Sequence, residues 1–433
     1  MTASLDPAIE AALRQLGVAP STSLAIGGIP ARELLARFGS PLYVFDAAVL
    51  RARLHTVQQA FGADATILWS VKANPSIAVT RVLRLAGAGA EIASLGELHV
   101  ALAAGHEAAA LRFAGPGKTD AELAAALAAG LGVVHVESLD EARALAAAAR
   151  ARSTVASVAV RINFAGELAG SRLRMGGGSS RFGIDEEQVP AVLRTIATEP
   201  ALRLVGVHAY AGTQLFDAAA FVAHAERVVA AVARWERDLA VALPEIDLGG
   251  GFGVAAFCGD GTFDLASAAA GVRRLLPTLP GPRRWFVELG RYLAAPAGVY
   301  LATVVRSKTS GRERHAVLDG GLHHHAAATG QGSLLRRLPL ALAVDAARRT
   351  GEPVTIGGPL CTPQDQFADQ APLGPLAVGD AVAFLNAGAY GLSYSPHSFL
   401  GHPTPAEVMV DAGAARVVRA RGDARDALRG QTP

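Results

Sequence analysis

The stretch VVHVESLDEARALAAAAR, residues 133–150, joins a short valine-rich run directly to a long run of helix formers. Valine favours strands, whereas alanine, leucine and arginine favour helices, so the stretch predicts one βα unit. The acidic residues that open the second half are typical of the first turn of a helix. A chain that repeats such units forms a parallel sheet with helices on its outside.

The same alternation recurs from about residue 41 to residue 293. The β-type runs are 42–46 (LYVFD), 65–72, 90–94, 111–115, 133–138, 157–163, 204–210, 245–251 and 284–290. We expect LYVFD to enter the barrel through a first helix, which leaves about eight strands. Residues 41–293 are therefore predicted to form a TIM-like (β/α)8 barrel, a fold of ~250 residues.

The pattern of the sequence changes after about residue 294. Short alternating runs separated by Gly or Pro follow, at 300–309, 315–321, 352–358, 381–388 and 406–413. Such runs predict antiparallel strands. We expect 294–433 to form a C-terminal antiparallel β-sandwich or β-barrel domain. Residues 1–40 do not fit the barrel repeat, and we expect them to return to this second domain.

Charge and composition exclude several classes of protein. The 40 Lys+Arg against 38 Asp+Glu give a net charge of +2, without the basic run that nucleic-acid binding needs. No apolar run reaches the roughly 20 residues of a membrane span. Cys258 and Cys361 cannot build a disulfide framework, and the N-terminus does not resemble a signal peptide. We therefore expect a cytoplasmic protein with no nucleic-acid or membrane partner.

Polar residues collect at the C-terminal ends of the predicted barrel strands, where barrel enzymes carry their active sites. Lys72 follows an apolar strand that would bury its charge unless the amine were paired or covalently used; a lysine in solvent at the barrel rim is the alternative. Residues 249–253 (GGGFG) would let backbone amides approach an anion, although tight turns also need glycine. Glu288 and Arg291 end the last strand, where a structural ion pair is the simpler interpretation.

Taken together, these residues fit a cofactor that carries an aldehyde and a phosphate. The lysine would bind the aldehyde covalently, the glycines and Arg291 would bind the phosphate, and Glu288 would bind a ring nitrogen. The glycine run does not have the GxGxxG spacing, with a following acid, that a dinucleotide site needs.

Motifs at six places extend this pattern: 70–75 (SVKANP), 91–97 (EIASLGE), 249–253 (GGGFG), 288–291 (ELGR), 358–361 (GPLC) and 388–390 (GAY). In this order they resemble the motif series of the fold-type III pyridoxal-phosphate decarboxylases. That family includes diaminopimelate, ornithine and arginine decarboxylases and has an alanine racemase-like fold. The resemblance covers nearly the whole chain.

The resemblance implies a role for each matching residue. Lys72 would bind pyridoxal 5'-phosphate covalently, and Glu288 would bind its pyridine nitrogen. Tyr210 stands where the family usually has a histidine stacked on the ring, and Cys361 would reach across the interface of a homodimer into the partner's site. The other implied cofactor contacts are Glu91, Ser94 and Arg161 near the ring and lysine, and Thr213, Gly250, Gly251, Gly290, Arg291 and Tyr390 near the phosphate.

The same residues imply the reaction. A carboxylate at position 288 keeps the pyridine nitrogen protonated and the ring a strong electron sink, which favours decarboxylation; the racemase relatives have an arginine there. After carbon dioxide leaves, one proton must be delivered, and the thiol of Cys361 is the candidate donor. A small core residue is the alternative interpretation of this cysteine.

Departures from the family pattern bear on the substrate. Thr362 stands where diaminopimelate and ornithine enzymes have an acid for the distal amine. The stretch 319–325, followed by Arg336 and Arg337, lacks the Arg-x-x-x-Tyr arrangement that holds the distal carboxylate of diaminopimelate. These departures resemble the branch that serves natural product biosynthesis, including enzymes acting on an amino acid attached to an acyl-carrier protein. Diaminopimelate decarboxylase of lysine biosynthesis is the alternative, and a non-enzymatic pyridoxal-phosphate carrier is a further one. The predicted substrate contacts are His323, Thr362 and Tyr390.

The run His323, His324 and His325 does not indicate a metal site. We expect it on a strand, where adjacent residues point to opposite faces, and no Cys or acid joins it at ligand spacing. We expect one or two of these histidines to line the substrate pocket or the dimer interface.

Overall fold

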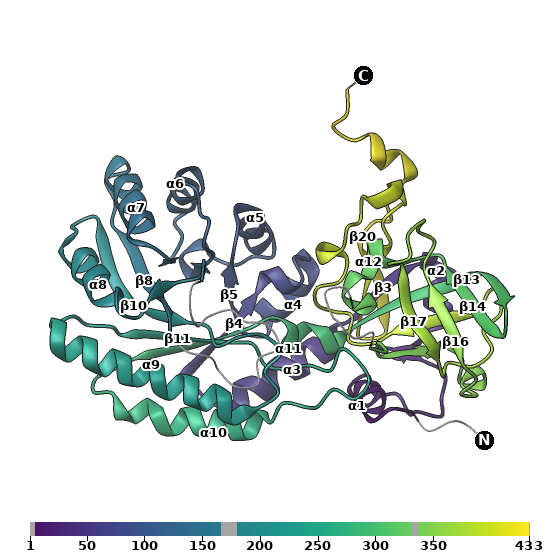
Figure 1. Cartoon of the computed structure of the whole chain (residues 1–433). Helices are drawn as coiled ribbons and strands as arrows, with labels where there is room; N and C mark the ends of the chain where they lie inside the picture. The colour runs from purple at the N-terminus through teal and green to yellow at the C-terminus, as the bar shows by residue number, and fades with distance from the viewer. Residues whose placement is uncertain (1–4, 166–179, 331–336, 433) are drawn as a thin grey trace. The chain divides into compact units, whose positions relative to one another are not determined.

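The computed structural model describes residues 5–165, 180–330 and 337–432, drawn in colour in Figure 1. The chain divides into two compact units. The barrel unit comprises Arg53–Gly253 and Thr262–Tyr292. The β-rich unit comprises the described residues of Met1–Ala52, Val254–Gly261 and Leu293–Pro433. None of the helices in the described ranges combines the length and the hydropathy that crossing a bilayer would need.

Within the described residues, the strands of the barrel unit close into a parallel ring of eight. In ring order they are β4 (Ala65–Ser70), β5 (Gly89–Ile92), β6 (Leu111–Phe113), β7 (Val133–Val136), β8 (Ala156–Asn163), β10 (Leu202–Ala209), β11 (Glu245–Gly250) and β12 (Arg284–Leu289). Strand β12 pairs with β4, which closes the ring, and the short β9 (Ile184–Asp185) lies beside β8. The predicted (β/α)8 barrel is confirmed.

Helices cover the outside of this ring (Figure 1). They are α4 (Ile77–Leu85), α5 (Leu95–Ala103), α6 (Asp120–Ala128), α7 (Leu139–Ala151), α8 (Val189–Thr198), α9 (Ala218–Leu239) and α10 (Leu265–Leu275). The side chain of Ser138 accepts a hydrogen bond from the amide of Glu141 at 3.0 Å at the start of α7. Thr119 and Glu122 form a capping box at α6. These caps satisfy backbone amides that the first turn of a helix leaves unpaired, and so fix where each helix begins.

The β-rich unit contains one large sheet, in the order β17 (Gln366–Ala371), β16 (Val354–Gly357), β14 (Glu313–Leu318), β13 (Gly298–Ser310), β3 (Leu42–Asp46), β19 (Ala406–Asp411) and β20 (Ala414–Arg419). Strand β18 (Ala381–Phe384) pairs with both β13 and β15 (Ala341–Ala343). Most pairs are antiparallel, as predicted. The pairs β14–β16 and β3–β19 are parallel.

The boundaries of the two units differ from the predicted ranges 41–293, 1–40 and 294–433. Strand β3, the LYVFD run, pairs with β13 and β19, so it is a central strand of the β-rich sheet. Residues Val254–Gly261 also group with that unit. Helices α1 (Pro7–Gln15) and α2 (Ala31–Phe38) bury Leu13 and Leu34 in the same hydrophobic core as the strands. A strand with all five residues buried is compatible with either sheet, so its burial pattern alone could not place it.

Candidate active site

Lys72 lies at the C-terminal end of β4, in the single turn Val71–Ala73 (η1) that follows the strand. Its side chain is 39% exposed, and its Nζ lies 3.1 Å from each carboxylate oxygen of Glu91. Glu91 is almost completely buried in β5, the neighbouring strand. The amine is therefore held by a fixed carboxylate and still reaches solvent.

The chain has only three lysines, and the other two are poor nucleophile candidates. The Nζ of Lys118 is buried and donates to the carbonyls of Gly115 and His135, at 2.7 and 2.8 Å, and to Glu141. Lys308 lies on the exposed end of β13 in the β-rich unit. An ammonium whose three protons are all in use is not free to bond to an incoming carbonyl carbon. Lys72 is thus the lysine best placed to bind a cofactor covalently.

Glu288 lies inside the barrel on β12, between β11 and β4. In the strand register it faces Gly250 on one side and Leu68 on the other. Its Oε2 lies 3.4 Å from Nε2 of His208, while its Oε1 has no hydrogen-bond partner within the described ranges. A buried acceptor without a partner is costly, so this atom fits a ligand that donates a hydrogen bond, such as a protonated ring nitrogen.

The surroundings of Glu288 control its charge. Burial alone raises the pKa of the carboxyl, but the charge and hydrogen bond of His208, followed by the charge of Lys72, outweigh it and lower the pKa below its ordinary value. Burial likewise lowers the pKa of His208, but Glu288, followed by Asp247, outweighs burial, so the net shift is upward. The two opposite shifts mean that each side chain favours the charged form of the other.

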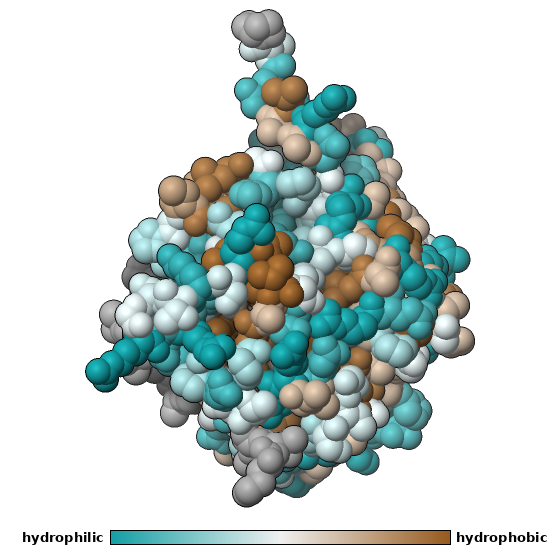
Figure 2. Space-filling view, turned by 90° about the vertical axis from the view of Figure 1, so that its right-hand side faces the viewer, coloured by the Kyte–Doolittle hydropathy of each residue, from teal (hydrophilic) through white to brown (hydrophobic). Residues whose placement is uncertain are grey.

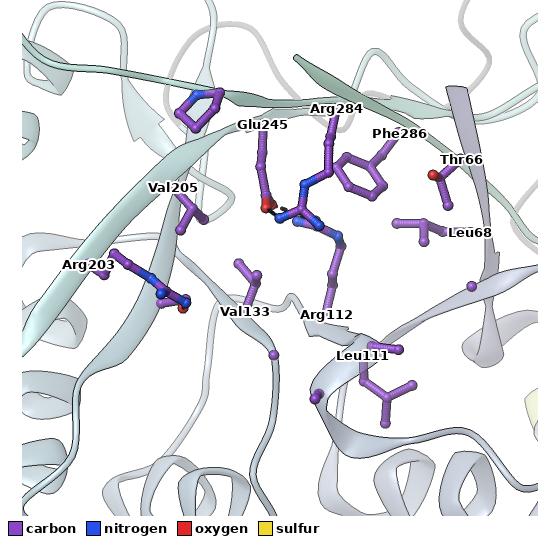
Figure 3. A pocket seen from close by; sticks show the side chains of 16 residues that line it. Thr66, Leu68, Leu111, Arg112, Val133, Arg203, Val205, Glu245, Arg284 and Phe286 are labelled. Carbon is purple, nitrogen blue, oxygen red and sulfur yellow. Dashed lines mark hydrogen bonds and ion pairs between the residues drawn. The ribbon is translucent and has the colours of Figure 1, made fainter. Parts of the chain in front are cut away.

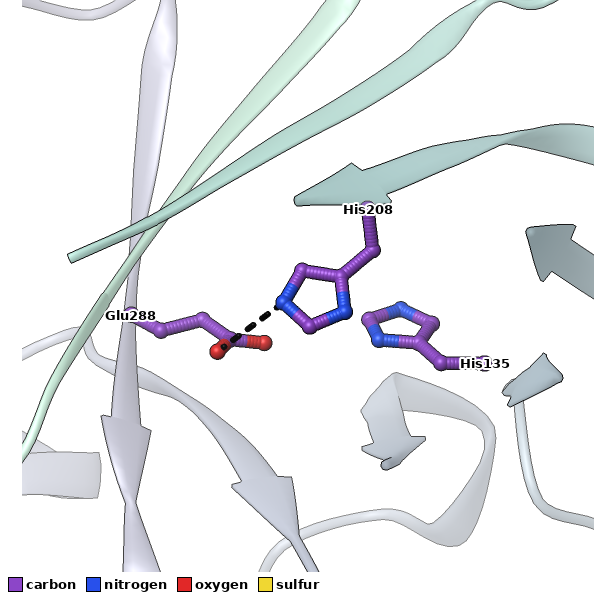
Figure 4. A group of neighbouring side chains, drawn as sticks. All are labelled: His135, His208 and Glu288. Atoms are coloured by element: carbon purple, nitrogen blue, oxygen red, sulfur yellow. Dashed lines mark ion pairs between the residues drawn. The ribbon is translucent and has the colours of Figure 1, made fainter. Parts of the chain in front are cut away.

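A second histidine completes this group. In Figure 4 the ring of His208 lies between Glu288 and His135, and the two imidazole centroids are 4.6 Å apart. Burial holds the pKa of His135 well below its ordinary value, so this ring is neutral. The three residues each offer a ligand atom within 4.8 Å of the others, which is a spacing that a metal could use. The role of this group toward a ring nitrogen stays a prediction.

The glycine run ends β11 with backbone that only glycine adopts easily. Gly249 and Gly251 have φ values of 62° and 88°. A side chain on Gly250 would collide with the carbonyl oxygen of Glu288, and one on Gly251 with that of Gly212. A Cβ at Gly249 would lie 2.8 Å from Cδ2 of Tyr210, so the tyrosine ring covers this end of the strand. The glycines thus have a packing reason, and their role toward a phosphate stays a prediction.

The segment after β12 approaches the Lys72 turn. A Cβ at Gly290 would lie 2.7 Å from Cβ of Ala73 and 3.3 Å from Cβ of Ser70. Gly290 therefore lets β12 and the turn that carries Lys72 come together. Arg291 begins the short helix α11 (Arg291–Ala294) directly after it. Thr213 is half-buried in the loop between β10 and α9.

Arg161 and Ser94 have structural partners. The side chain of Ser94 caps α5 by accepting a hydrogen bond from the amide of Glu97 at 3.2 Å. Arg161 is buried on β8 and donates to Oε1 of Glu137 at 2.7 Å. Glu137 also accepts from the amides of Gly115 and Gly183, at 2.8 and 2.9 Å. Sequence reasoning missed Glu137, although a lone acid directly after a buried strand is a signal that could have found it.

Glu97, the last residue of the motif 91–97, lies in an unusual environment. Its Oε2 accepts a hydrogen bond from the amide of Ala93 at 2.7 Å. Burial, followed by the negative charge of Glu91, raises the pKa of Glu97 to about 7. A carboxyl that titrates near neutral pH beside the Lys72–Glu91 pair is a candidate for proton transfer or charge balance.

The remaining candidates lie in the β-rich unit. Cys361 is exposed, and Thr362 beside it accepts a hydrogen bond from the amide of Gln364 at 3.3 Å. Asp365 organises this loop, because its two carboxylate oxygens accept from the amides of Leu322 and Leu360 at 2.6 and 2.8 Å. Tyr390 is half-buried and has a φ of 53°.

The expectation for the histidine run was wrong about its secondary structure. His323, His324 and His325 form part of a one-turn helix, α12 (Leu322–His325), and all three are buried. Nε2 of His324 donates to the carbonyl oxygen of Pro403 at 2.9 Å, and its Nδ1 lies 3.3 Å from Tyr300 Oη. That of His325 lies 3.0 Å from Tyr43 Oη. Burial, with the nearby His402, lowers the pKa of His323 to about 4. These rings belong to the interior of the unit, and a substrate contact from His323 stays a prediction.

Comparison with known proteins defines the class. Residues 47–295 match the family described as "Pyridoxal-dependent decarboxylase, pyridoxal binding domain". The chain belongs to this family. It is a pyridoxal-phosphate-dependent carboxy-lyase, as predicted.

Two curated enzymes and one crystal structure illustrate the similarity. The chain is 34% identical over 401 residues to L-glutamyl-[BtrI acyl-carrier protein] decarboxylase of Niallia circulans, covering 91% of this chain and 94% of the relative. It is 31% identical to the diaminopimelate decarboxylase of Zymomonas mobilis, covering 94% and 96%. The crystal structure of diaminopimelate decarboxylase from Helicobacter pylori complexed with L-lysine superposes with a TM-score of 0.85 at 25% identity, covering 92% and 98%.

Proposed function

We propose that this enzyme decarboxylates an α-amino acid tethered to an acyl-carrier protein, with a glutamyl group as the first candidate. The observation that carries this proposal is the loop after Cys361. Thr362 is neutral, and the one acid nearby, Asp365, is buried with both carboxylate oxygens bonded to backbone amides. The loop therefore offers no free carboxylate that could bind a distal ammonium group. A tethered amino acid has no distal ammonium group and does not need such a carboxylate. The similarity to the glutamyl-carrier decarboxylase supports the same choice.

We assign the cofactor contacts as the family pattern implies. Lys72 binds pyridoxal phosphate covalently, and Glu288 holds the proton at the ring nitrogen because His208 keeps the carboxyl ionised. When bound, the cofactor accepts the electron pair that remains on the α-carbon as carbon dioxide leaves. The proposed supporting contacts are Tyr210 on the ring, Glu91, Ser94 and Arg161 around it, and Thr213, Gly250, Gly251, Gly290, Arg291 and Tyr390 toward the phosphate.

We further propose a homodimer in which Cys361 and Tyr390 of one subunit serve the partner's site. Cys361 is exposed, as a residue that acts on another subunit must be. Apolar side chains are also exposed just after Tyr390: Tyr394 is 67%, Phe399 43% and Leu400 53% exposed. Figure 2 shows apolar patches among hydrophilic residues on one face of the molecule. Exposed aromatic and aliphatic side chains near a site favour contact with a second copy.

A cytoplasmic location is part of the proposal. Cys258 and Cys361 are both free thiols. A reducing compartment keeps an exposed thiol available for proton transfer.

The substrate proposal predicts which compounds release carbon dioxide. The cofactor-loaded enzyme should release it from glutamyl-loaded carrier protein at least about 100-fold faster than from free diaminopimelate, a gap of roughly 3 kcal/mol. Aspartyl-loaded carrier, free glutamate and ornithine complete the series. Rapid release from free diaminopimelate would instead make this a diaminopimelate decarboxylase.

The role of Cys361 predicts a second result. Cys361→Ala should lower kcat about 100-fold, because the proton then has to come from water, and positioned proton donors contribute roughly 10²- to 10⁴-fold. Cys258→Ala is the matched control: that thiol is half-buried, and burial raises its pKa to about 11. Mixing Cys361→Ala with Lys72→Ala should restore activity through heterodimers that carry one intact site. Failure of the mixture to regain activity would argue against shared sites.

A further inference from the structure

A cavity lies at the end of the barrel opposite to the Lys72 turn. It has a volume of about 490 Å³ and is lined by residues at the starts of the strands, among them Thr66 of β4, Leu111 of β6 and Arg284 of β12. Barrel interiors are normally filled by side chains. Here Gly89, Gly132 and the alanines 109 and 110 contribute little volume. The space is of the size that small-molecule sites have.

The charges of this cavity are unbalanced. Three guanidinium groups line it, from Arg112, Arg203 and Arg284, against the single carboxylate of Glu245. Figure 3 shows Arg112 and Arg284 converging on Glu245. Arg112 Nη2 lies 2.5 Å from its Oε2, and Arg284 pairs with Oε1. Arg203 donates to Ser157 Oγ at 2.7 Å. One carboxylate is thus shared by two cations, and the third cation has only a neutral partner among these residues.

Arg112 carries the clearest sign of a missing partner. The residue is only 5% exposed, and no described residue accepts a hydrogen bond from its buried Nη1. Its guanidinium carbon lies 3.6 Å from the centroid of the Phe286 ring. Burial, followed by repulsion from Arg112 and Arg203, lowers the pKa of Arg284. A bound anion would supply the missing acceptor and reduce this repulsion.

We propose that this cavity binds a small organic anion, with its carboxylate or phosphate group on Arg112 and Arg284 and an apolar body against Phe286, Val133 and Val205. Arginine is suited to such a site because its planar guanidinium binds oxyanions through two parallel hydrogen bonds. Arg284 begins β12 and Leu111 begins β6, whereas Glu288 lies near the C-terminal end of β12 and Lys72 follows the C-terminal end of β4. The site is therefore distinct from the decarboxylation site and does not depend on the proposed substrate.

Calorimetric titration of the cofactor-saturated enzyme tests the proposal, because the cofactor then fills its own phosphate site. Phenyl phosphate and benzoate are the anionic probes, and benzyl alcohol is the neutral one. We expect one equivalent of at least one anionic probe to bind and benzyl alcohol not to bind; the tighter anion identifies the preferred oxyanion. Arg284→Gln should weaken the binding about tenfold or more, the loss of one charge-assisted hydrogen bond.

Two further variants sharpen the result. Ala110→Phe places a ring into the cavity from an exposed position and should also block the anionic probes. Arg194→Gln removes an exposed arginine of α8 outside the cavity. This variant should bind the anionic probes as tightly as the unaltered enzyme does. Folding is checked by the cofactor's absorption in each variant. Absence of binding by both anions up to millimolar concentrations would overturn the proposal. So would binding that neither Arg284→Gln nor Ala110→Phe weakens.

Discussion

Replacing Lys72 with alanine is expected to lower kcat by on the order of 10⁴-fold and to remove the visible absorption of the lysine-bound cofactor. Lys72 is the lysine that is both fixed, by Glu91 at 3.1 Å, and open to solvent, at 39% exposure. Without it, the cofactor has no covalent anchor and the site loses an amine that can also move protons. Steady-state kinetics and absorption spectra of the purified variant measure both effects.

The control for this variant is Lys308→Ala. Lys308 lies on the exposed end of β13, so its loss should change neither the spectrum nor kcat. Lys118 is less useful, because its buried ammonium is held by Glu141 and two carbonyls, and its removal would damage the barrel. A Lys72→Ala protein with an unchanged spectrum and rate would show that the cofactor is anchored elsewhere.

Glu288→Gln is expected to lower kcat by about 10²- to 10³-fold, the size of effect seen when one preorganised electrostatic group is removed. The amide is nearly the same shape as the carboxyl but carries no charge. It therefore cannot hold the proton at the ring nitrogen, and the ring becomes a weaker electron sink. Kinetics at saturating substrate and cofactor separate this effect from weaker binding.

The pH dependence tests why Glu288 is ionised. Its pKa is lowered below the ordinary value by His208, so its contribution to stability and activity is present above that ordinary value and is lost only as the pH falls through the lowered one. His208→Leu removes the imidazole that lowers the pKa of Glu288. The carboxyl stays buried, and burial raises its pKa. The acidic limb of the rate profile should then move to higher pH by about one unit or more.

His135 provides a matched comparison for His208. Both imidazoles are fully buried and 4.6 Å apart, but His135 is neutral because burial lowers its pKa. His135→Leu should therefore leave the acidic limb of the rate profile at nearly the same pH as in the unaltered enzyme. Equal shifts in the two variants would mean that packing, and not the charge of His208, sets the ionisation of Glu288.

The sequence was sufficient to predict the barrel and the ends of its strands. Lys72 and Glu288 could be identified because each is a charged residue at the end of an otherwise apolar run, and a closed barrel brings such ends together. The family resemblance then supplied a role for each. The structure adds the partners that hold them, Glu91 at 3.1 Å and His208 at 3.4 Å.

Other features could not be predicted, for identifiable physical reasons. Strand β3 is buried throughout, so its sequence does not say which sheet it joins. The histidines 323–325 form a helical turn and not the expected strand, and within it His325 contacts Tyr43 and His324 contacts Tyr300. Tyr43 lies 282 residues before His325 and Tyr300 lies 24 residues before His324, so local sequence does not show these contacts. The hydrogen bond that Asp365 accepts from the amide of Leu322 also joins segments that are distant in the sequence.

The most direct test of the account is to find which residue carries the cofactor. Treatment of the loaded enzyme with borohydride makes the lysine–cofactor bond permanent, and peptide mass spectrometry then locates the modified residue. We expect modification of Lys72 and no modification of Lys118 or Lys308. Modification of Lys118 or Lys308 in place of Lys72 would contradict it.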